Sequence, residues 1–324
     1  MSEENINIAT KEYADAHFGN TSETNDNLVI ATKEYVDSIP PGMVIDGTAL
    51  KGQLCNHYLA TTVGDGADGS MLTDGSCMFY KCYNLTSWTV DLPNLTNGTS
   101  MFYACIGLTS WTVELPNLTD GQNMFYSCSG LTSWTVDLPS LTDGSYMFQE
   151  CSNLTSWTVD LPNLTEGYYM FGSCPKLTSF TGGLPNLTDG QNMFYSCSGL
   201  TSWTVDLPSL TEAYNMFYRC SSLTSFNAGT EGLKSLNEGT NMFYNCKLDE
   251  TSVLHILNTI PTYTSGTHKL HIGKYTNYQT SDKVAAKLRT STGGTVSTPI
   301  PAATNYRCVD DDGNDKGWTI TVQA

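Results

Sequence analysis

The amino-acid sequence predicts a mainly β fold, a solenoid of about eight 23-residue units with short N-terminal helices and a small α+β cap after the last unit. Two observations predict the solenoid. A Met-Phe pair returns at a fixed interval, with six successive steps of 23 residues and a last step of 26: Met78, Met101, Met124, Met147, Met170, Met193, Met216 and Met242. Within each interval apolar and polar residues alternate, as in a half-buried strand. A period of this size is typical of solenoids, whose units bury their apolar faces against one another.

Residues 1–41 are predicted to be an attachment and oligomerisation segment. The phrase Ala-Thr-Lys-Glu-Tyr-x-Asp occurs from Ala9 and again, 22 residues later, from Ala31. The threonine of each copy is suited to cap a short helix, because its side chain accepts hydrogen bonds from first-turn amides. Helices this short are unstable alone in water, so we expect each to pack on a partner, such as other copies of the chain in a homotrimer. Pro40-Pro41-Gly42 then forms a stiff linker.

Each repeat is predicted to contain one strand. In a representative repeat it is expected at Trp134–Leu138, where apolar and polar residues alternate. Leu131, Trp134 and Val136 reproduce the Leu-x-x-Leu-x-Leu spacing of leucine-rich repeats, with tryptophan in the second leucine position. Pro139 is expected to end the strand, because it has no amide hydrogen to donate to a ladder.

Two further features complete the repeat. Asp143-Gly144 is expected to turn the chain, with the glycine supplying a backbone conformation that other residues avoid. The Met-Phe-Tyr-x-Cys stretch is expected to cover the core from a second side, as a helical turn or a brief strand. Its tyrosines are expected to be partly exposed: Tyr80, Tyr103, Tyr126, Tyr195, Tyr218 and Tyr244.

Two other residue types recur at fixed positions and are expected in the core. One position holds Trp88, Trp111, Trp134, Trp157, Phe180, Trp203 and Phe226. A tryptophan row could also stack on sugars, so a carbohydrate platform stays open as an alternative. Another position holds Cys82, Cys105, Cys128, Cys151, Cys174, Cys197, Cys220 and Cys246, where free thiols act as small buried hydrophobes. Because the sequence contains no Cys-x-x-Cys pair, no zinc site is expected.

The polar face of the predicted strand offers candidate ligand-binding residues. Ser133, Thr135 and Asp137 share this face, and an acid recurs at the position of Asp137 in most repeats. Like charges one strand apart repel each other, so the row is open to three interpretations: a solvated surface, a cation site, or a pair of carboxylates for glycoside hydrolysis. The candidate ligand-binding residues are Thr112, Thr135, Asp137, Thr158, Asp160 and Asp206, and no catalytic residue, metal ligand or cofactor is predicted.

The period stops after Cys246, and the three predicted domains are therefore residues 1–41, 42–248 and 249–324. In the last of these, helices are expected at Thr251–Ile260 and Ser281–Thr290, and strands at Lys269–Lys274 and Trp318–Val322. Such an atypical end covers the last repeat of a solenoid. The acidic stretch at 310–315 is interpreted as a turn rather than a calcium loop, because it lacks the downstream glutamate of an EF-hand.

Charge and hydropathy exclude some partners. The formal net charge of −17 disfavours nucleic acid, whose phosphates require clustered Lys and Arg. No apolar run reaches the roughly 20 residues that span a bilayer, so membrane insertion is not expected. The polar, acidic start of the sequence is unlike a secretory signal peptide.

The repeats also contain an internal duplication, since residues 115–142 and 184–211 are identical. Copying repeats lengthens or changes a surface, which suits recognition. Catalysis needs one unique constellation of residues, so binding is favoured over an enzymatic activity.

The phrase Met-Phe-Tyr-x-Cys-Ser-x-Leu-Thr-Ser at a 23-residue period resembles the BspA-like leucine-rich repeats of bacterial surface proteins, in particular the branch rich in Met-Phe repeats. The segments Leu254–Asn258, His268–Gly273 and Asp315–Thr319 resemble the cap of such proteins. This resemblance implies adhesion at a cell surface and no enzymatic activity. It carries over no catalytic residues.

The repeated phrase from Ala9 and Ala31 is similar to one found near the start of phage tail-fibre proteins. A phage protein leaves the cell by lysis and needs no export signal, so this resemblance implies a virion location. The expected function is therefore receptor binding by a phage or prophage tail-fibre component, with a cell-surface glycan or protein and other tail proteins as partners. The alternatives are an exported BspA-like adhesin at the cell surface that binds host matrix proteins and, third, a glycan depolymerase.

Overall fold

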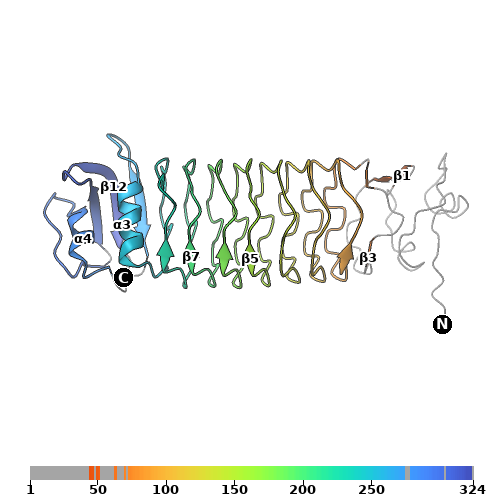
Figure 1. Ribbon diagram of the computed structural model, residues 1–324, viewed down its shortest axis with the longest axis horizontal. Coiled ribbons are helices and arrows are strands. Elements are labelled where there is room, and N and C mark those ends of the chain that lie inside the picture. Colours follow the sequence, from red (N-terminus) through yellow and green to blue (C-terminus); the bar gives the residue numbers. More distant parts are fainter. Residues whose placement is uncertain are drawn as a thin grey trace, which may run out of the picture. The chain divides into compact units, whose positions relative to one another are not determined.

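The computed structural model describes residues 44–46, 49–51, 62–63, 69–70, 72–273, 278–302 and 304–322. The chain divides into two compact parts, residues 1–154 (the first part) and residues 155–324 (the second part). In each part the repeats run as coils, one beside the next (Figure 1). The described residues are mainly β and irregular, with only two helices, so a mainly β repeat fold is confirmed. The predicted N-terminal helices lie outside the described residues.

The described strands before and within the repeats are short. In the first part β1 (Val44–Asp46) and β2 (Ala49–Lys51) form an antiparallel pair ahead of the Met-Phe repeats. The other pairs are parallel, beginning with β3 (Thr62–Val63) and β4 (Ser87–Trp88). In the second part β5 (Ser156–Trp157) pairs with β6 (Ser179–Phe180), and β7 (Ser202–Trp203) pairs with β8 (Ser225–Phe226). In the β5–β6 and β7–β8 pairs each residue faces its equivalent in the next repeat, 23 residues away.

The strand expected at Trp134–Leu138 is not formed: the structure has no regular strand at these residues, and the described repeats that do have one pair over two residues only, as at Ser156–Trp157. Its alternation is real, since Trp134, Val136 and Leu138 are buried while the residues between them are exposed. Regular strand pairing is nevertheless absent here and at Trp111. The indole Nε1 of Trp134 donates to the carbonyl oxygen of Val136 at 2.7 Å, which occupies an acceptor that a strand ladder would use.

The Met-Phe-Tyr segment forms a turn that is bonded from repeat to repeat. In the first part the amides of Ser100, Phe102 and Ala104 donate to the carbonyl oxygens of residues 122, 124 and 126, at 2.8, 2.9 and 2.6 Å. Ser100 and Ala104 have φ angles of 54° and 57°, which bend the chain between these bonds. The segment therefore closes the core from the second side, as predicted, but as a turn with left-handed residues rather than a helical turn or a brief strand.

The core consists of aromatic rings stacked one repeat apart. Phe102 and Phe125 lie 5.5 Å apart, Trp111 and Trp134 lie 6.2 Å apart, and each pair is nearly parallel. Within the second part, Phe194 and Phe217 repeat the arrangement at 5.5 Å. The described Met-Phe, tryptophan and ladder-cysteine positions are at most 3% exposed. The tryptophan row is thus core, and the carbohydrate platform is wrong.

The cysteine ladder consists of buried thiols that form no disulfide. At most ladder positions Sγ donates to the carbonyl oxygen of a phenylalanine in the preceding repeat, as in Cys128 to Phe102 at 3.2 Å and Cys220 to Phe194 at 3.1 Å. Burial raises the pKa of Cys128 and of Cys197 to about 12. The predicted role of these residues as buried hydrophobes is confirmed.

The chain after the repeats forms two helices and a sheet. Helix α3 (Glu250–Thr259) begins at the N-cap Asp249, and helix α4 (Asp282–Ala286) begins at the N-cap Ser281. The sheet has the order β10-β11-β12-β9, with β9 (His268–Ile272), β10 (Leu288–Arg289), β11 (Thr304–Val309) and β12 (Asp315–Val322). Helix α4 is shorter than expected because β10 begins at Leu288, and β10 and β11 were not predicted.

The last repeat is bonded directly to this sheet. The amide of Gly239 donates to the carbonyl oxygen of Lys269 at 2.9 Å, and the amide of Phe243 donates to that of His271 at 3.2 Å. Helix α3 contacts the repeats as well, because Ser252 Oγ accepts from the amide of Phe226 at 2.8 Å. Strand β9 therefore lies between the last repeat and β12.

Candidate ligand-binding surface

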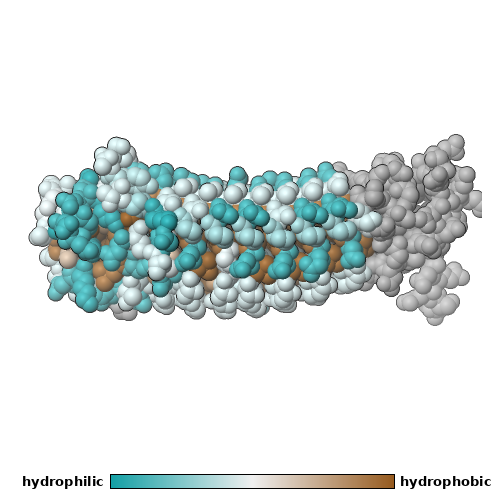
Figure 2. Space-filling model, turned by 45° about the horizontal axis from the view of Figure 1, so that its top comes forward, coloured by the Kyte–Doolittle hydropathy of each residue, from teal (hydrophilic) through white to brown (hydrophobic). Residues whose placement is uncertain are grey.

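The candidate residues of the strand face are exposed in both parts. In the first part these are Thr112, Thr135 and Asp137, and in the second part Thr158, Asp160 and Asp206. Their exposure follows from the alternation, since Val136 and Val159 turn inward between the exposed positions. Figure 2 shows that the visible surface of the repeats is mostly hydrophilic or intermediate, with hydrophobic colour confined to narrow strips.

The row of acids differs between the two parts. In the first part it is continuous, with Asp91, Glu114 and Asp137 in successive repeats. In the second part acid and glycine alternate, in the order Asp160, Gly183, Asp206 and Gly229. This alternation separates the carboxylates by two repeats, about 10 Å at a strand spacing of about 4.8 Å, and so reduces the repulsion between them.

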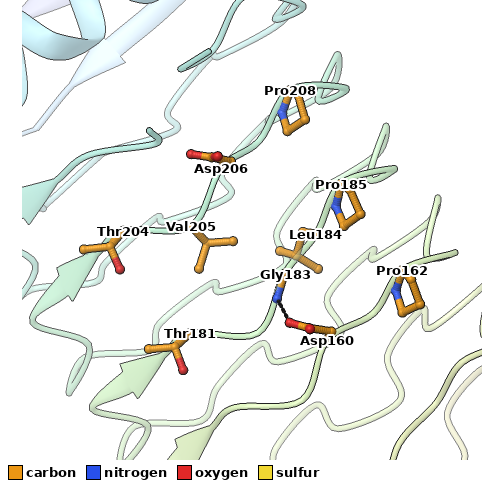
Figure 3. Close-up of a pocket in the computed structure, with 10 residues that line it drawn as sticks. All are labelled: Asp160, Pro162, Thr181, Gly183, Leu184, Pro185, Thr204, Val205, Asp206 and Pro208. Carbon is orange, nitrogen blue, oxygen red and sulfur yellow. Dashed lines mark hydrogen bonds between the residues drawn. The ribbon is translucent and has the colours of Figure 1, made fainter. Parts of the chain in front are cut away.

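Each of these glycines makes room for the acid of the preceding repeat. Asp160 Oδ1 accepts a hydrogen bond from the amide of Gly183 at 2.6 Å. A Cβ atom on Gly229 would stand 1.4 Å from Asp206 Oδ1, so the Asp206 carboxylate occupies the space of the missing side chain. Both carboxylates are therefore directed toward the following repeat, as Figure 3 shows.

Gly182 brings the backbone of its repeat close to the preceding one. Most other repeats have valine at this position, and one has Ala228, but a Cβ atom on Gly182 would lie 2.0 Å from the carbonyl oxygen of Val159. Two inter-repeat hydrogen bonds form beside it, from the Thr181 amide to the Trp157 carbonyl oxygen and from the Leu161 amide to that of Gly183, both at 2.9 Å. The paired glycines thus create a local depression in the strand face.

A shallow groove of about 520 Å³ lies over this depression. Its lining comes from three successive repeats of the second part: Asp160, Pro162, Thr181, Gly183, Leu184, Pro185, Thr204, Val205, Asp206 and Pro208 (Figure 3). Thr181 and Thr204 are exposed and carry hydroxyl groups, while Leu184 and Val205 are buried beneath the surface. The groove brings two predicted residues, Asp160 and Asp206, to one site, and leaves the other four outside it.

The groove lacks the carboxylate pair that glycoside hydrolysis requires. In such enzymes both acids face the scissile bond, roughly 5 Å apart for retention or 6.5–9.5 Å apart for inversion. Only Asp160 is directed toward Gly183, because the Asp206 carboxylate lies against Gly229. The geometry favours binding over hydrolysis.

A second row of polar side chains was missed by sequence reasoning. Asp120 and Asp143 in the first part, and Asp189 in the second, accept hydrogen bonds from the amides two residues further on, at 2.8 to 3.0 Å. The row also bonds across repeats, as Gln122 Nε2 donates to Asp143 Oδ2 at 2.9 Å. The recurring Asp-Gly pair was the available signal, and it was assigned only to a turn. These bonds give the row a structural role.

The tyrosines of the Met-Phe-Tyr segment are half-buried, as predicted, and stack in rows. Tyr103 and Tyr126 lie 4.6 Å apart with parallel rings, and Tyr218 and Tyr244 lie 4.8 Å apart. Burial raises the pKa of Tyr103 and, together with a hydrogen bond to Glu150, that of Tyr126. Because stacked rings cover one another's faces, these rows present edges and hydroxyl groups to solvent.

Metal binding is not indicated by the described residues, among which no group of three or more His, Cys, Asp or Glu is placed to hold an ion.

The acidic stretch at 310–315 forms the turn between β11 and β12. Asp310 Oδ1 accepts from the amides of Asp312 and Asn314 at 3.0 and 2.8 Å. Hydrogen bonds from Asn314 hold the pKa of Asp310 below its ordinary value.

Among the described helices, none is long and apolar enough to cross a membrane.

The repeats match a known family. The model of the BspA type leucine-rich repeat region matches six copies, over residues 75–201 and 144–266, which together cover more than half of the chain. The chain belongs to this BspA type leucine-rich repeat family. Proteins with such repeats are in general binding proteins of cell surfaces or secreted proteins.

The BspA type repeat chain also has a counterpart among solved structures. It is similar to an internalin from Listeria monocytogenes strain 4b F2365, with 16% identity and a TM-score of 0.28. The match covers 64% of this chain and 66% of the internalin chain, so the chain spans slightly less than two thirds of that protein. No curated protein matches the chain in sequence.

Proposed function

We propose that the chain is a receptor-binding protein, a component of a phage or prophage tail fibre that recognises a glycan or protein on a bacterial cell surface. One observation carries the proposal: Ser, Thr and Asp side chains are exposed in register over a fully buried aromatic core. A rigid core fixes these side chains before binding, which lowers the entropic cost of association. Several weak contacts along the repeats, and several copies on one particle, add up to firm attachment.

The tail-fibre assignment is supported by the repeated phrase from Ala9 and Ala31, which suits assembly with other tail proteins into a homotrimer on the virion. Family membership supports the alternative, an exported surface adhesin that binds host matrix proteins. In either case the proposed activity is binding, without catalysis, cofactor, nucleic acid or membrane insertion. The glycan depolymerase is the least supported, because only one carboxylate is directed into the groove beside Gly183.

We further propose that residues 249–324 cap about eight repeats. The support is the continuous bonding from Gly239 through β9 to β12, together with the contact of Ser252 on Phe226. A chain ending at Leu248 would expose the edge of the last repeat and aggregate. A soluble, monodisperse truncated protein in size-exclusion chromatography would refute the cap.

Two measurements test the receptor-binding proposal. Light scattering compares the mass of the full chain with that of a chain starting at Gly42, and we expect a trimer that falls to a monomer. Cell-binding assays compare the wild-type protein with a variant carrying Thr135→Ala, Asp137→Ala and Asp160→Ala. A monomer in both preparations would move the exported adhesin ahead, and unchanged cell binding by the variant would eliminate recognition by the strand face.

A further inference from the structure

One repeat departs from a pattern that the chain otherwise copies closely. Residues 184–211 repeat residues 115–142 without change, but the repeat just before residue 184 has glycine at both Gly182 and Gly183. Its equivalents in the next repeat are Val205 and Asp206. These two differences remove side chains from the strand face and produce the groove described above.

We propose that the groove beside Gly183 binds a neutral, hydroxyl-rich sugar residue of a cell-surface glycan, an inference that rests on the proposed receptor-binding function. The first reason is the orientation of Asp160. Its Oδ1 is held by the Gly183 amide at 2.6 Å, which fixes the carboxylate at the edge of the groove. The carboxylate keeps further acceptor positions, since an ionised carboxyl group has about four lone-pair sites. Those positions suit sugar hydroxyl donors.

The remaining lining is equally suited to a sugar ring. The hydroxyl groups of Thr181 and Thr204 can both donate and accept, and they are exposed on neighbouring repeats. Pro162, Pro185 and Pro208 add flat apolar rings along the groove, against which the C–H face of a pyranose can pack. Figure 3 shows the prolines on one side of the lining and the threonines on the other. A sugar residue satisfies both kinds of surface at once.

Charged ligands fit the groove less well. The formal net charge of −17 and the carboxylates at the groove disfavour acidic sugars, phosphorylated chains and nucleic acid. A lone cation gains little from a solvent-exposed carboxylate, because water screens the pair. A cation would also leave the threonine hydroxyls and the proline rings without partners. Neutral sugars therefore match the lining best.

The test uses the full chain and four single variants. Asp160→Asn keeps the acceptor for the Gly183 amide but replaces the free carboxylate oxygen with an amide group. Gly183→Asp restores the residue common in other repeats and fills the depression. Asp206→Asn changes the acid that lies against Gly229, and Asp137→Asn makes the same change in the first part. Matching melting temperatures would establish that all four fold.

The probe is an array of oligosaccharides in neutral, amine-bearing and acidic groups, followed by calorimetric titration with the tightest neutral binder. We expect neutral oligosaccharides to bind the wild-type protein, and Asp160→Asn and Gly183→Asp to weaken binding by about tenfold or more, the usual effect of losing a hydrogen bond to a charged group. Asp137→Asn should stay within about twofold, because Asp137 lies outside the groove. Asp206 lines the groove but its carboxylate lies against Gly229, so Asp206→Asn should weaken binding less than Asp160→Asn does.

Three results would overturn the inference: no neutral oligosaccharide binds, only charged oligosaccharides bind, or Asp160→Asn binds as well as Asp137→Asn. Cell binding separates this inference from the proposed function. If the wild-type protein and Asp160→Asn attach equally to cells, receptor binding stands and the sugar site is wrong. If the wild-type protein attaches to no cell surface, the receptor-binding function itself fails.

Discussion

Trp134 and Thr135 are neighbours in the chain and lie in opposite environments. The indole of Trp134 is 2% exposed and lies 5.0 Å from the ring of Phe125 and 4.8 Å from that of Phe148. The side chain of Thr135 is exposed on the strand face. The two positions therefore separate the contribution of the core from that of the surface.

We expect Trp134→Ala to lower the free energy of unfolding by about 3–5 kcal/mol, because it leaves a cavity in the aromatic stack. Thr135→Ala should change it by less than about 0.5 kcal/mol, as for most surface substitutions. Urea unfolding followed by circular dichroism measures both. Equal effects of the two substitutions would contradict the assignment of tryptophan to the core.

The glycine of the Asp-Gly pair has a different role from the one predicted, as Gly121 shows. The expectation was a glycine with an unusual backbone conformation, but the positive φ angles fall instead on residues such as Asn123 and Ser127, at 54° and 55°. A Cβ atom on Gly121 would stand 2.7 Å from Met147 Sδ of the next repeat. The glycine is needed for the space that a methionine fills.

At the scale of the strand, alternation predicted burial better than it predicted hydrogen bonding. Leu131, Trp134 and Val136 are buried as the leucine-rich spacing required. The expected strand at Trp134–Leu138 was wrong. The bond from the Trp134 indole to the Val136 carbonyl oxygen depends on three-dimensional geometry that periodicity does not contain. The period fixes which face is apolar, and side-chain contacts decide where pairing stops.

The candidate site was predictable only in part, for a related reason. Exposure of Asp160 and Asp206 followed from the alternation, but the direction of each carboxylate depends on the glycine one repeat later. Gly183 was visible as a gap in the acid row. The closer backbone approach at Gly182 was not, because it arises from contact between repeats.

The adjacent glycines Gly182 and Gly183 provide a test of that contact. Gly182→Ala places Cβ 2.0 Å from the Val159 carbonyl oxygen, which forces the strands apart, whereas at Gly183 the nearest atom is Asp160 Oδ1 at 3.1 Å. We expect Gly182→Ala to lower the free energy of unfolding by about 1–3 kcal/mol, and hence the melting temperature by several degrees. Gly183→Ala should change the melting temperature little. Calorimetry of both variants measures the two melting temperatures. A larger decrease for Gly183→Ala than for Gly182→Ala would contradict the close backbone contact at Gly182.

For the molecule as a whole, the cysteine ladder links stability to pH. Burial raises the pKa of Cys128 and Cys197 from 9.0 to about 12, so folding favours the protonated thiols. Their contribution is complete below the unfolded value near pH 9 and is lost as pH rises toward 12. Each thiol adds a slope of up to about 1.4 kcal/mol per pH unit in that window.

We therefore expect the urea concentration at the unfolding midpoint to decrease as the pH is raised from 9 to 12. The decrease should be smaller for a variant carrying both Cys128→Ala and Cys197→Ala. The comparison with this variant removes the contribution of the tyrosines, which both proteins share. Identical slopes for the two proteins would show that the thiols do not govern the alkaline transition.

The same ladder determines where the chain can be made. In the folded protein the thiols are sealed from oxidants, and no disulfide is present among the described residues. A newly made chain would instead expose equivalent cysteines at regular intervals, which an oxidising medium would join at random. Synthesis and closure of the repeats in a reducing cytoplasm avoid this, and the finished protein then withstands air. Refolding that succeeds with reduced glutathione and fails with oxidised glutathione would establish that order of events.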